Sequence, residues 1–214
     1  RVKNPIDLAL AVMEQSPHVM LSGKGAETFA VEKGFLLVDP SYFHTDKRYN
    51  QLQKIKQREK EKAVSVSFED PFIKDSKFGT VGCAALDKNG NLAAGTSTGG
   101  MTNKRYGRIG DVPVIGAGTY AENDVCGISS TGHGEFFIRN VVAHDIAARM
   151  KYAGHSIEKA STEVIAALKE KGGAGGVIGL DSQGHVVMPF NTPGMFRGYI
   201  TLDGSPVVAI YAED

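Results

Sequence analysis

The feature that most constrains the fold of this chain is a change of sequence pattern at Gly79 and Thr80. The tract before this point is dense in charges of both signs and then has mixed polarity with no sustained period. After it, short apolar runs alternate with turn residues, and an Asn-Gly pair at positions 89–90 lies between two of these runs. Such a pair is the strongest short signal for a β-hairpin. The sequence therefore predicts a strand at residues 80–87 and an antiparallel partner at residues 92–98.

The rest of the chain mixes helical and strand-like patterns. Capping residues and apolar spacing predict helices at residues 5–16, 26–33, 46–62, 136–152 and 156–171. Further strands are expected at residues 18–21, 114–120, 125–130, 177–181, 185–189 and 204–210. The glycine run at residues 172–176 leads into a strand pattern and not a helix, which argues against a phosphate-binding loop. This order of elements indicates a layered α+β fold.

Length and charge set limits on domain number and partners. With 214 residues, 42% of them hydrophobic, the chain is long enough to bury one substantial core, so a single domain is expected. Lys+Arg and Asp+Glu number 24 each, so the net charge gives no reason to expect nucleic acid or an anionic membrane as a partner. A small or neutral substrate is the expected partner.

The cysteines and the hydropathy pattern indicate a cytoplasmic protein. Cys83 and Cys126 lie in strand-like apolar runs and are expected to be reduced core residues, not a disulfide. The chain has neither an apolar run of about 18 residues nor a signal-peptide pattern, so no membrane span or leader is expected. Because the chain begins at Arg1 and not at Met, we expect an additional N-terminal piece.

Thr80 is a candidate nucleophile. A threonine hydroxyl attacks a carbonyl only when a base lies within hydrogen-bonding distance. Cleavage of the Gly79–Thr80 bond would supply that base, because the freed α-amino group has an ordinary pKa of about 7.7–8.0 and can take a proton. Gly79 suits such a cleavage, because a residue without a Cβ tolerates a strained backbone. The alternative is a purely structural role, in which Gly79 and Thr80 simply begin a strand.

Three sequence blocks downstream of Thr80 carry a family resemblance. They are Gly-Thr-Ser-Thr-Gly-Gly-Met-Thr-Asn-Lys at residues 95–104, Gly-Arg-Ile-Gly-Asp at 107–111 and Ser-Thr-Gly-His-Gly-Glu at 130–135. With Gly79-Thr80 they form four blocks in register, and an upstream His-Val-Met-Leu run at residues 18–21 also matches. The sequence resembles the plant-type asparaginases, or isoaspartyl peptidases, of the N-terminal-nucleophile hydrolases over nearly its whole length, least at about residues 51–78.

The resemblance implies a finer fold and an activity. The implied fold is a four-layer αββα sandwich, with residues 1–79 as the C-terminal part of an α-subunit with its linker and residues 80–214 as the β-subunit, together forming one domain. The family's N-terminal strand and helix have no counterpart in this sequence. The implied function is autoprocessing followed by hydrolysis of β-aspartyl dipeptides and L-asparagine, by an αβ heterodimer that dimerises to a heterotetramer. No cofactor is expected, although a structural sodium ion is possible.

By the same resemblance, Thr98 supports the nucleophile. The predicted hairpin would place its hydroxyl beside that of Thr80, although an ordinary strand threonine is the bland alternative. Arg108 is a planar donor suited to a carboxylate and Asp111 can accept an ammonium, so the two would hold a free α-amino acid. A mutual ion pair between Arg108 and Asp111 is the structural alternative.

The last block implies the oxyanion and substrate contacts. Thr131 and Gly132 stand at a predicted strand end, where a hydroxyl and a backbone N–H could stabilise a developing oxyanion. The family carries these roles at the matching positions, and Gly134 matches a substrate-lining glycine. His133 is not expected to be catalytic. Glu135 is expected to favour the start of the following helix electrostatically.

Two other functions fit part of this pattern. A glycosylasparaginase also has a nucleophilic threonine after a processing site, but its relatives usually carry Asp before that threonine, whereas this chain has Gly79. An inactive, unprocessed fragment is the second alternative. Whether the purified protein splits into two chains would separate these cases.

Overall fold

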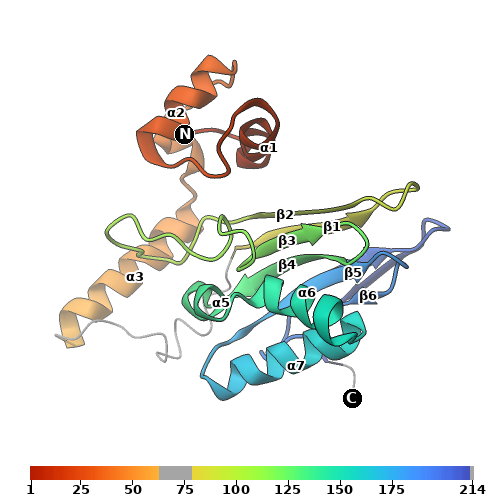
Figure 1. Cartoon of the computed structure of the whole chain (residues 1–214). Helices are drawn as coiled ribbons and strands as arrows, with labels where there is room; N and C mark the ends of the chain where they lie inside the picture. Colours follow the sequence, from red (N-terminus) through yellow and green to blue (C-terminus); the bar gives the residue numbers. More distant parts are fainter. Residues whose placement is uncertain (63–78, 213–214) are drawn as a thin grey trace. The chain divides into compact units, whose positions relative to one another are not determined.

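The computed structural model describes residues 1–62 and 79–212, and it contains both helices and sheets, as expected for an α+β fold (Figure 1). The chain divides into two compact units, one comprising residues 1–77 and 100–108 and the other residues 78–99 and 109–214. Each unit is described separately below. The predicted linker before Phe78 lies outside the described residues. The assignment of residues 1–79 and 80–214 to two subunits stays a prediction.

The first unit is mainly helical in its described residues, 1–62 and 100–108. It contains α1 (Pro5–Gln15), α2 (Gly23–Glu32), the short 3₁₀ helix η1 (Pro40–Phe43) and α3 (Asp46–Lys62). Pro5 begins α1 because its fixed φ suits the first helical position. Asp39 begins η1 by accepting a hydrogen bond from the Ser41 backbone N–H at 2.9 Å.

The predicted strand at residues 18–21 is wrong. The structure has no strand there, and Val19 and Met20 are 80% and 45% exposed. An apolar run of this length indicates burial only if a partner strand pairs with it, and the described part of this unit supplies none for these residues.

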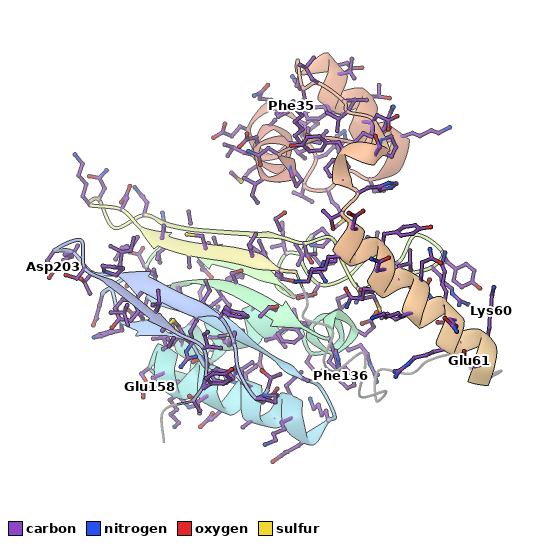
Figure 2. The ribbon with its side chains drawn as sticks, turned by 180° about the vertical axis from the view of Figure 1, so that it is seen from behind. Phe35, Lys60, Glu61, Phe136, Glu158 and Asp203 are labelled. Atoms are coloured by element: carbon purple, nitrogen blue, oxygen red, sulfur yellow. The ribbon has the colours of Figure 1, made fainter. Side chains whose placement is uncertain are left out.

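Helix α3 has the predicted bounds, and its charged C-terminal half is largely solvated. Lys60 and Glu61 are exposed near its end (Figure 2), whereas Ile55 is buried. Glu59 on the same helix accepts a hydrogen bond from Asn103 Nδ2 at 3.0 Å and forms an ion pair with Arg105. The loop of residues 100–108 is therefore attached to α3 within this unit.

The described residues of the second unit, 79–99 and 109–212, form three antiparallel sheets and three helices. β1 (Val81–Leu86) pairs with β2 (Leu92–Ser97) in the predicted hairpin, and β7 (Arg197–Ile200) pairs with β8 (Pro206–Ala209). The central sheet has the order β3-β4-β5-β6 and consists of β3 (Thr119–Glu122), β4 (Cys126–Gly132), β5 (Gly175–Asp181) and β6 (Val186–Val187). The helices are α5 (Gly134–Asn140), α6 (Val142–Ala153) and α7 (Ile157–Glu170).

The two faces of the central sheet are covered differently. One face buries an apolar core against α5, α6 and α7, formed by Cys126, Ile128, Phe137, Val142, Ala143, Ile146, Ala147, Ile157, Ala160, Val164, Ile165, Leu168, Val177 and Val187. The other face contacts the β1–β2 hairpin, where Gly82 lies over Ser129 and Ala84 lies near Gly127. Within this unit the layers are therefore hairpin, sheet and helices.

The predicted helix at residues 136–152 is two helices. Val141 adopts a left-handed conformation with φ 48° and separates α5 from α6. The break has a tertiary reason, because the Ala143 and His144 N–H groups at the start of α6 donate to the carbonyls of Ala117 and Gly116 at 3.2 and 2.8 Å. Apolar periodicity alone could not reveal these partners.

Several predicted strands have different bounds. Residues 114–118 form a bend, an isolated bridge at Ile115 and a turn instead of the first part of a strand, and β3 begins only at Thr119. The segment expected at residues 185–189 is reduced to the two residues of β6. Strand β7 was not predicted, whereas β8 lies within the expected segment 204–210.

The two cysteines have different environments. Both are free thiols, and Cys126 is buried as predicted, which raises its pKa to about 12. The prediction of a core position is wrong for Cys83, which is exposed. Side chains alternate along β1, so Cys83 points away from the central sheet that Gly82 contacts. In the described ranges 1–62 and 79–212, no helix is long and apolar enough to cross a membrane.

Candidate active site

Thr80 and Thr98 lie together at the open end of the β1–β2 hairpin. Thr80 directly precedes β1 and Thr98 directly follows β2, and the pair Val81↔Ser97 sets the register beside them. The Thr80 hydroxyl donates a hydrogen bond to Thr98 Oγ1 at 3.1 Å, and both residues are half-buried. The hairpin register thus brings the two hydroxyls side by side, and Gly79 is exposed next to them.

A cluster of hydroxyl groups fixes the strands that carry these two threonines. Thr96 Oγ1 lies 2.6 Å from Ser129 Oγ, and Thr119 Oγ1 lies 2.5 Å from Thr96 Oγ1 and 3.4 Å from the Val112 carbonyl oxygen. Thr96 and Ser129 are buried between the hairpin and the central sheet. Sequence reasoning missed this cluster, although the two-residue period of β2 places Thr96 on the face of Thr98.

Thr131 and Gly132 end the strand β4. Ser130 N–H donates to the Gly118 carbonyl on the β3 side, and His133 N–H donates to the Ala174 carbonyl on the β5 side. N–H groups of successive residues in a strand point to opposite sides, so Gly132 N–H points away from β5. The β3–β4 ladder ends at Thr119↔Ser129, before it reaches Gly132. This geometry suits an N–H group that is to bind a ligand oxygen.

Glycine is required at position 132. Its φ is 153°, and a Cβ there would lie 2.4 Å from the Ala174 carbonyl oxygen and 2.7 Å from the Phe137 ring. Gly175, its partner in β5, has φ 154° and the same lack of space, with a Cβ 2.3 Å from the Thr131 carbonyl oxygen. The two glycines allow β4 and β5 to approach closely at the strand end.

Asp111 is attached to the same strand end through Gly118. The Gly118 N–H donates to the Asp111 carbonyl at 3.2 Å, and the Gly118 carbonyl accepts from Ser130 N–H at 2.8 Å. A Cβ on Gly118 would lie 2.7 Å from the Asp111 carbonyl, so the approach again depends on glycine. Asp111 is 5% exposed. Two hydrogen bonds therefore link the backbone of Asp111 to the residue before Thr131.

The other predicted residues are distributed over both units. Gly134 is the buried first residue of α5, and Glu135 lies in its first turn, as predicted. His133 precedes the helix and is buried. Arg108 belongs to the loop of the first unit, where its N–H donates to the Arg105 carbonyl at 2.9 Å.

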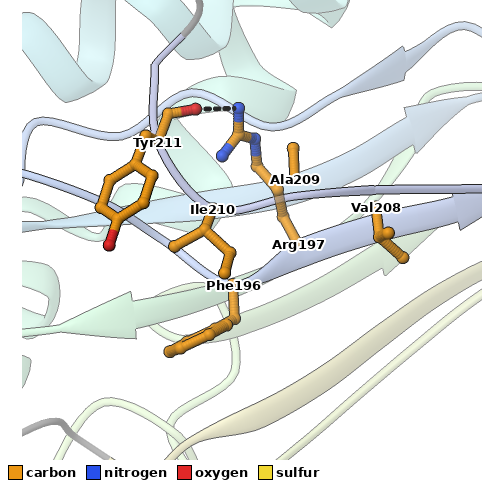
Figure 3. Close-up of a pocket in the computed structure, with 6 residues that line it drawn as sticks. All are labelled: Phe196, Arg197, Val208, Ala209, Ile210 and Tyr211. Carbon is orange, nitrogen blue, oxygen red and sulfur yellow. Dashed lines mark hydrogen bonds between the residues drawn. The ribbon is translucent and has the colours of Figure 1, made fainter.

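The predicted site residues form no metal-binding cluster in the described part of the chain. Within residues 1–62 and 79–212, no three His, Cys, Asp or Glu side chains are grouped so that they could hold a metal ion. A shallow hollow of about 550 Å³ is lined by Phe196, Arg197, Val208, Ala209, Ile210 and Tyr211 (Figure 3), where Arg197 donates to the Tyr211 carbonyl at 2.9 Å. None of the predicted site residues lines it.

Comparison of the sequence with known proteins identifies a family and several relatives. A family model described as asparaginase matches residues 1–210. The isoaspartyl peptidases of Escherichia coli strain K12 and Salmonella typhimurium are 48% and 47% identical over 99% of this chain. The isoaspartyl peptidase/L-asparaginase of Rattus norvegicus is 38% identical over 91% of it. The chain covers 66%, 67% and 56% of these three relatives, respectively, so it spans about two thirds of the length of the bacterial ones.

Proposed function

Because this chain belongs to the asparaginase family, we propose that the protein is an autoprocessing threonine amidohydrolase that hydrolyses β-aspartyl dipeptides and L-asparagine. The observation that carries the proposal is the 3.1 Å hydrogen bond between the Thr80 and Thr98 hydroxyls, next to the exposed Gly79. The names of the bacterial and rat relatives supply the substrate class.

Maturation is the first chemical step of the proposal. The Thr80 hydroxyl attacks the Gly79 carbonyl, the acyl group moves from the Thr80 nitrogen to its oxygen, and water hydrolyses the resulting ester. The cleavage releases Gly79 as a new carboxyl terminus and Thr80 as a new amino terminus. Thr80 then has a hydroxyl nucleophile and an amine base in one residue.

Hydrolysis of the substrate amide uses the same hydroxyl. The Thr80 amine takes the hydroxyl proton, the oxygen attacks the β-carbonyl, and the leaving amine or ammonia departs with a proton. Thr98 holds the nucleophile through its hydrogen bond, and the Thr131 hydroxyl and Gly132 N–H stabilise the oxyanion. Water then attacks the acyl-enzyme and frees aspartate.

The remaining residues of the proposal bind the substrate. Arg108 binds the α-carboxylate of the substrate, Asp111 binds its ammonium group, and Gly134 leaves space for both. We propose that the protein has the four-layer αββα sandwich and assembles as a heterotetramer in the cytoplasm. No catalytic metal or cofactor takes part in this scheme, and a structural sodium ion is compatible with it.

A denaturing gel of purified Thr80→Ala protein tests the proposal. Wild-type protein is expected to separate into two chains at the Gly79–Thr80 bond, and the variant is expected to stay as one chain without amidase activity. Thr102→Ala, in the neighbouring glycine-rich block, serves as a control and should still be processed. Cleavage of Thr80→Ala at the same bond would contradict the role of the hydroxyl.

A further inference from the structure

Asn191 is bonded to Gly175, the residue opposite Gly132 at the end of β4. Its carboxamide uses the oxygen and both N–H groups in hydrogen bonds. Its Oδ1 accepts from the Gly175 N–H at 2.9 Å, and its Nδ2 donates to the carbonyls of Ile165 and Gly173 at 3.2 and 3.0 Å. The Asn191 backbone N–H also donates to the Gly175 carbonyl at 3.0 Å. Both backbone polar groups of Gly175 are thus bonded to Asn191.

Gly175 in turn defines the position of Gly132. The two residues face each other across β4 and β5, at a position in the ladder where no hydrogen bond joins them directly. They are in close contact, because a Cβ on Gly175 would lie 2.8 Å from Gly132 Cα. The adjacent Ala174 carbonyl accepts the His133 N–H at 2.9 Å. Displacement of Gly175 would therefore move Gly132 and reorient its N–H.

The glycine loop that leads into β5 cannot hold this position through its own side chains. Gly172 and Gly175 have positive φ values, and Gly173 packs so tightly on Leu168 and Phe136 that a Cβ would lie 2.8 and 3.0 Å from them. Glycine loses more conformational entropy on folding than other residues do, so this loop is costly to order. The Asn191 carboxamide supplies the missing restraint by joining this loop to the Ile165 carbonyl in α7.

We infer that Asn191 is a positioning residue for amide hydrolysis, acting through Gly175 to hold the Gly132 N–H where the oxyanion develops. The inference rests on the proposed function. An N–H donor in an oxyanion hole contributes to the transition state far more than to the ground state, so its misplacement lowers kcat and leaves KM nearly unchanged. Asn191 itself touches no reacting atom in this scheme.

The experiment compares Asn191→Ala and Asn191→Asp with Asn123→Ala in the full-length protein. Asn123 is a matched control, because its carboxamide also accepts a backbone N–H, that of Leu92 at 2.9 Å, and donates to Asn91. The Asp variant keeps the shape and the acceptor of Asn191 but loses both donated hydrogen bonds, so it provides a second test if the Ala variant does not fold.

The activity readout is kcat and KM for a β-aspartyl dipeptide. We expect both Asn191 variants to lower kcat by about 10- to 100-fold, with KM changed less than about threefold, because a small misplacement of a catalytic group has effects of this order. Asn123→Ala should keep wild-type kcat even where its melting temperature falls equally. Unchanged kcat in a folded Asn191 variant, or an equal loss of kcat in Asn123→Ala, would overturn the inference.

A second readout does not depend on activity. Amide hydrogen exchange at residues 131–134 and 174–176 should accelerate in the Asn191 variants and not in Asn123→Ala. Unchanged protection there would overturn the positioning role. If the wild-type protein hydrolyses neither β-aspartyl dipeptides nor asparagine, the proposed function fails, whereas faster exchange in the Asn191 variants would still support the restraint on Gly132.

Discussion

Gly82 shows how closely the nucleophile-bearing strand approaches the central sheet. A Cβ at this position would lie 1.9 Å from Ser129 Oγ and 2.8 Å from Ser129 Cβ. Ser129 cannot simply rotate away, because its hydroxyl is held by Thr96 at 2.6 Å in a buried cluster. The β1–β2 hairpin can therefore approach the central sheet this closely only because residue 82 has no Cβ.

Gly82→Ala is expected to destabilise the protein by about 1–3 kcal/mol, the usual cost of inserting atoms into a packed interior. Unfolding in urea, followed by circular dichroism, measures the change in the free energy of unfolding. Gly99→Ala is the matched control, because a Cβ there has no neighbour within 4 Å and the backbone is unstrained. Equal stability of the two variants would show that β1 can move away from the sheet.

Residues whose position follows from a regular pattern could be predicted, and those held by tertiary contacts could not. The Asn-Gly pair indicated a hairpin with strands at residues 80–87 and 92–98, and Thr80 and Thr98 lie at the open ends of these strands, so their proximity could be expected from the sequence. Asn191 lies outside any helix or strand, and its partners are 16 to 26 residues away, so no local signal marks it. The roles of the site residues themselves stay predictions.

Asp87 organises the turn between β1 and β2. Its Oδ1 accepts the N–H groups of Asn89 and Asn91, each at 2.8 Å, and its Oδ2 accepts from the Asn91 side chain at 2.8 Å. The hydrogen bond from the Asn91 side chain, followed by the backbone bonds, lowers the pKa of this carboxyl below its ordinary value. The folded turn therefore favours the ionised form.

This shift predicts how the stability of the protein depends on pH. Because the folded pKa of Asp87 is depressed, its contribution is complete above the unfolded value of about 3.9 and is lost as the pH falls through the folded pKa. Asp87→Asn should therefore show a smaller fall in the free energy of unfolding than wild type between about pH 6 and pH 3. Asn91→Ala keeps the carboxyl of Asp87 but removes the side chain that lowers its pKa most. The pH-dependent loss in its free energy of unfolding should therefore be intermediate between those of wild type and Asp87→Asn. Identical pH dependence in all three proteins would remove Asp87 from this role.

Helices and strands were predictable where local capping and period agree with the fold. The β1–β2 hairpin has such a signal in its turn, and its position was confirmed, as were the predicted bounds of α3. Val141 could not be predicted, because a β-branched residue at φ 48° is locally unfavourable and is held there by the flanking helices and their tertiary hydrogen bonds. Strand β7 consists of only four residues, Arg-Gly-Tyr-Ile, which give little alternation to recognise.

At the scale of the whole chain, the family could be recognised from the sequence. Gly79-Thr80 and the three downstream blocks are separated along the chain, and they occur in the same order as in the family. The match to the asparaginase family over residues 1–210 confirms that resemblance. The boundaries of the two compact units were not predictable, because residues 100–108 join the first unit through the contacts of Glu59 with Asn103 and Arg105. Long-range ion pairs of this kind leave no periodic trace in a sequence.

Cleavage at the Gly79–Thr80 bond links maturation of the whole protein to the pH dependence of its activity. Only the cleaved protein has a Thr80 α-amine, and that amine is a base only when it is neutral, so kcat should rise as the pH passes through its pKa. Its ordinary value is about 7.7–8.0, and desolvation beside the strand β1 would lower it by disfavouring the ammonium form. The acid limb of the kcat profile for a β-aspartyl dipeptide, measured on fully processed protein, is therefore expected at or below this range.

Thr80→Ser should keep the limb with a lower kcat, because it retains the amine and changes the nucleophile. A limb well above the ordinary range, or a flat profile from about pH 4 to 9, would mean that another group removes the proton from Thr80.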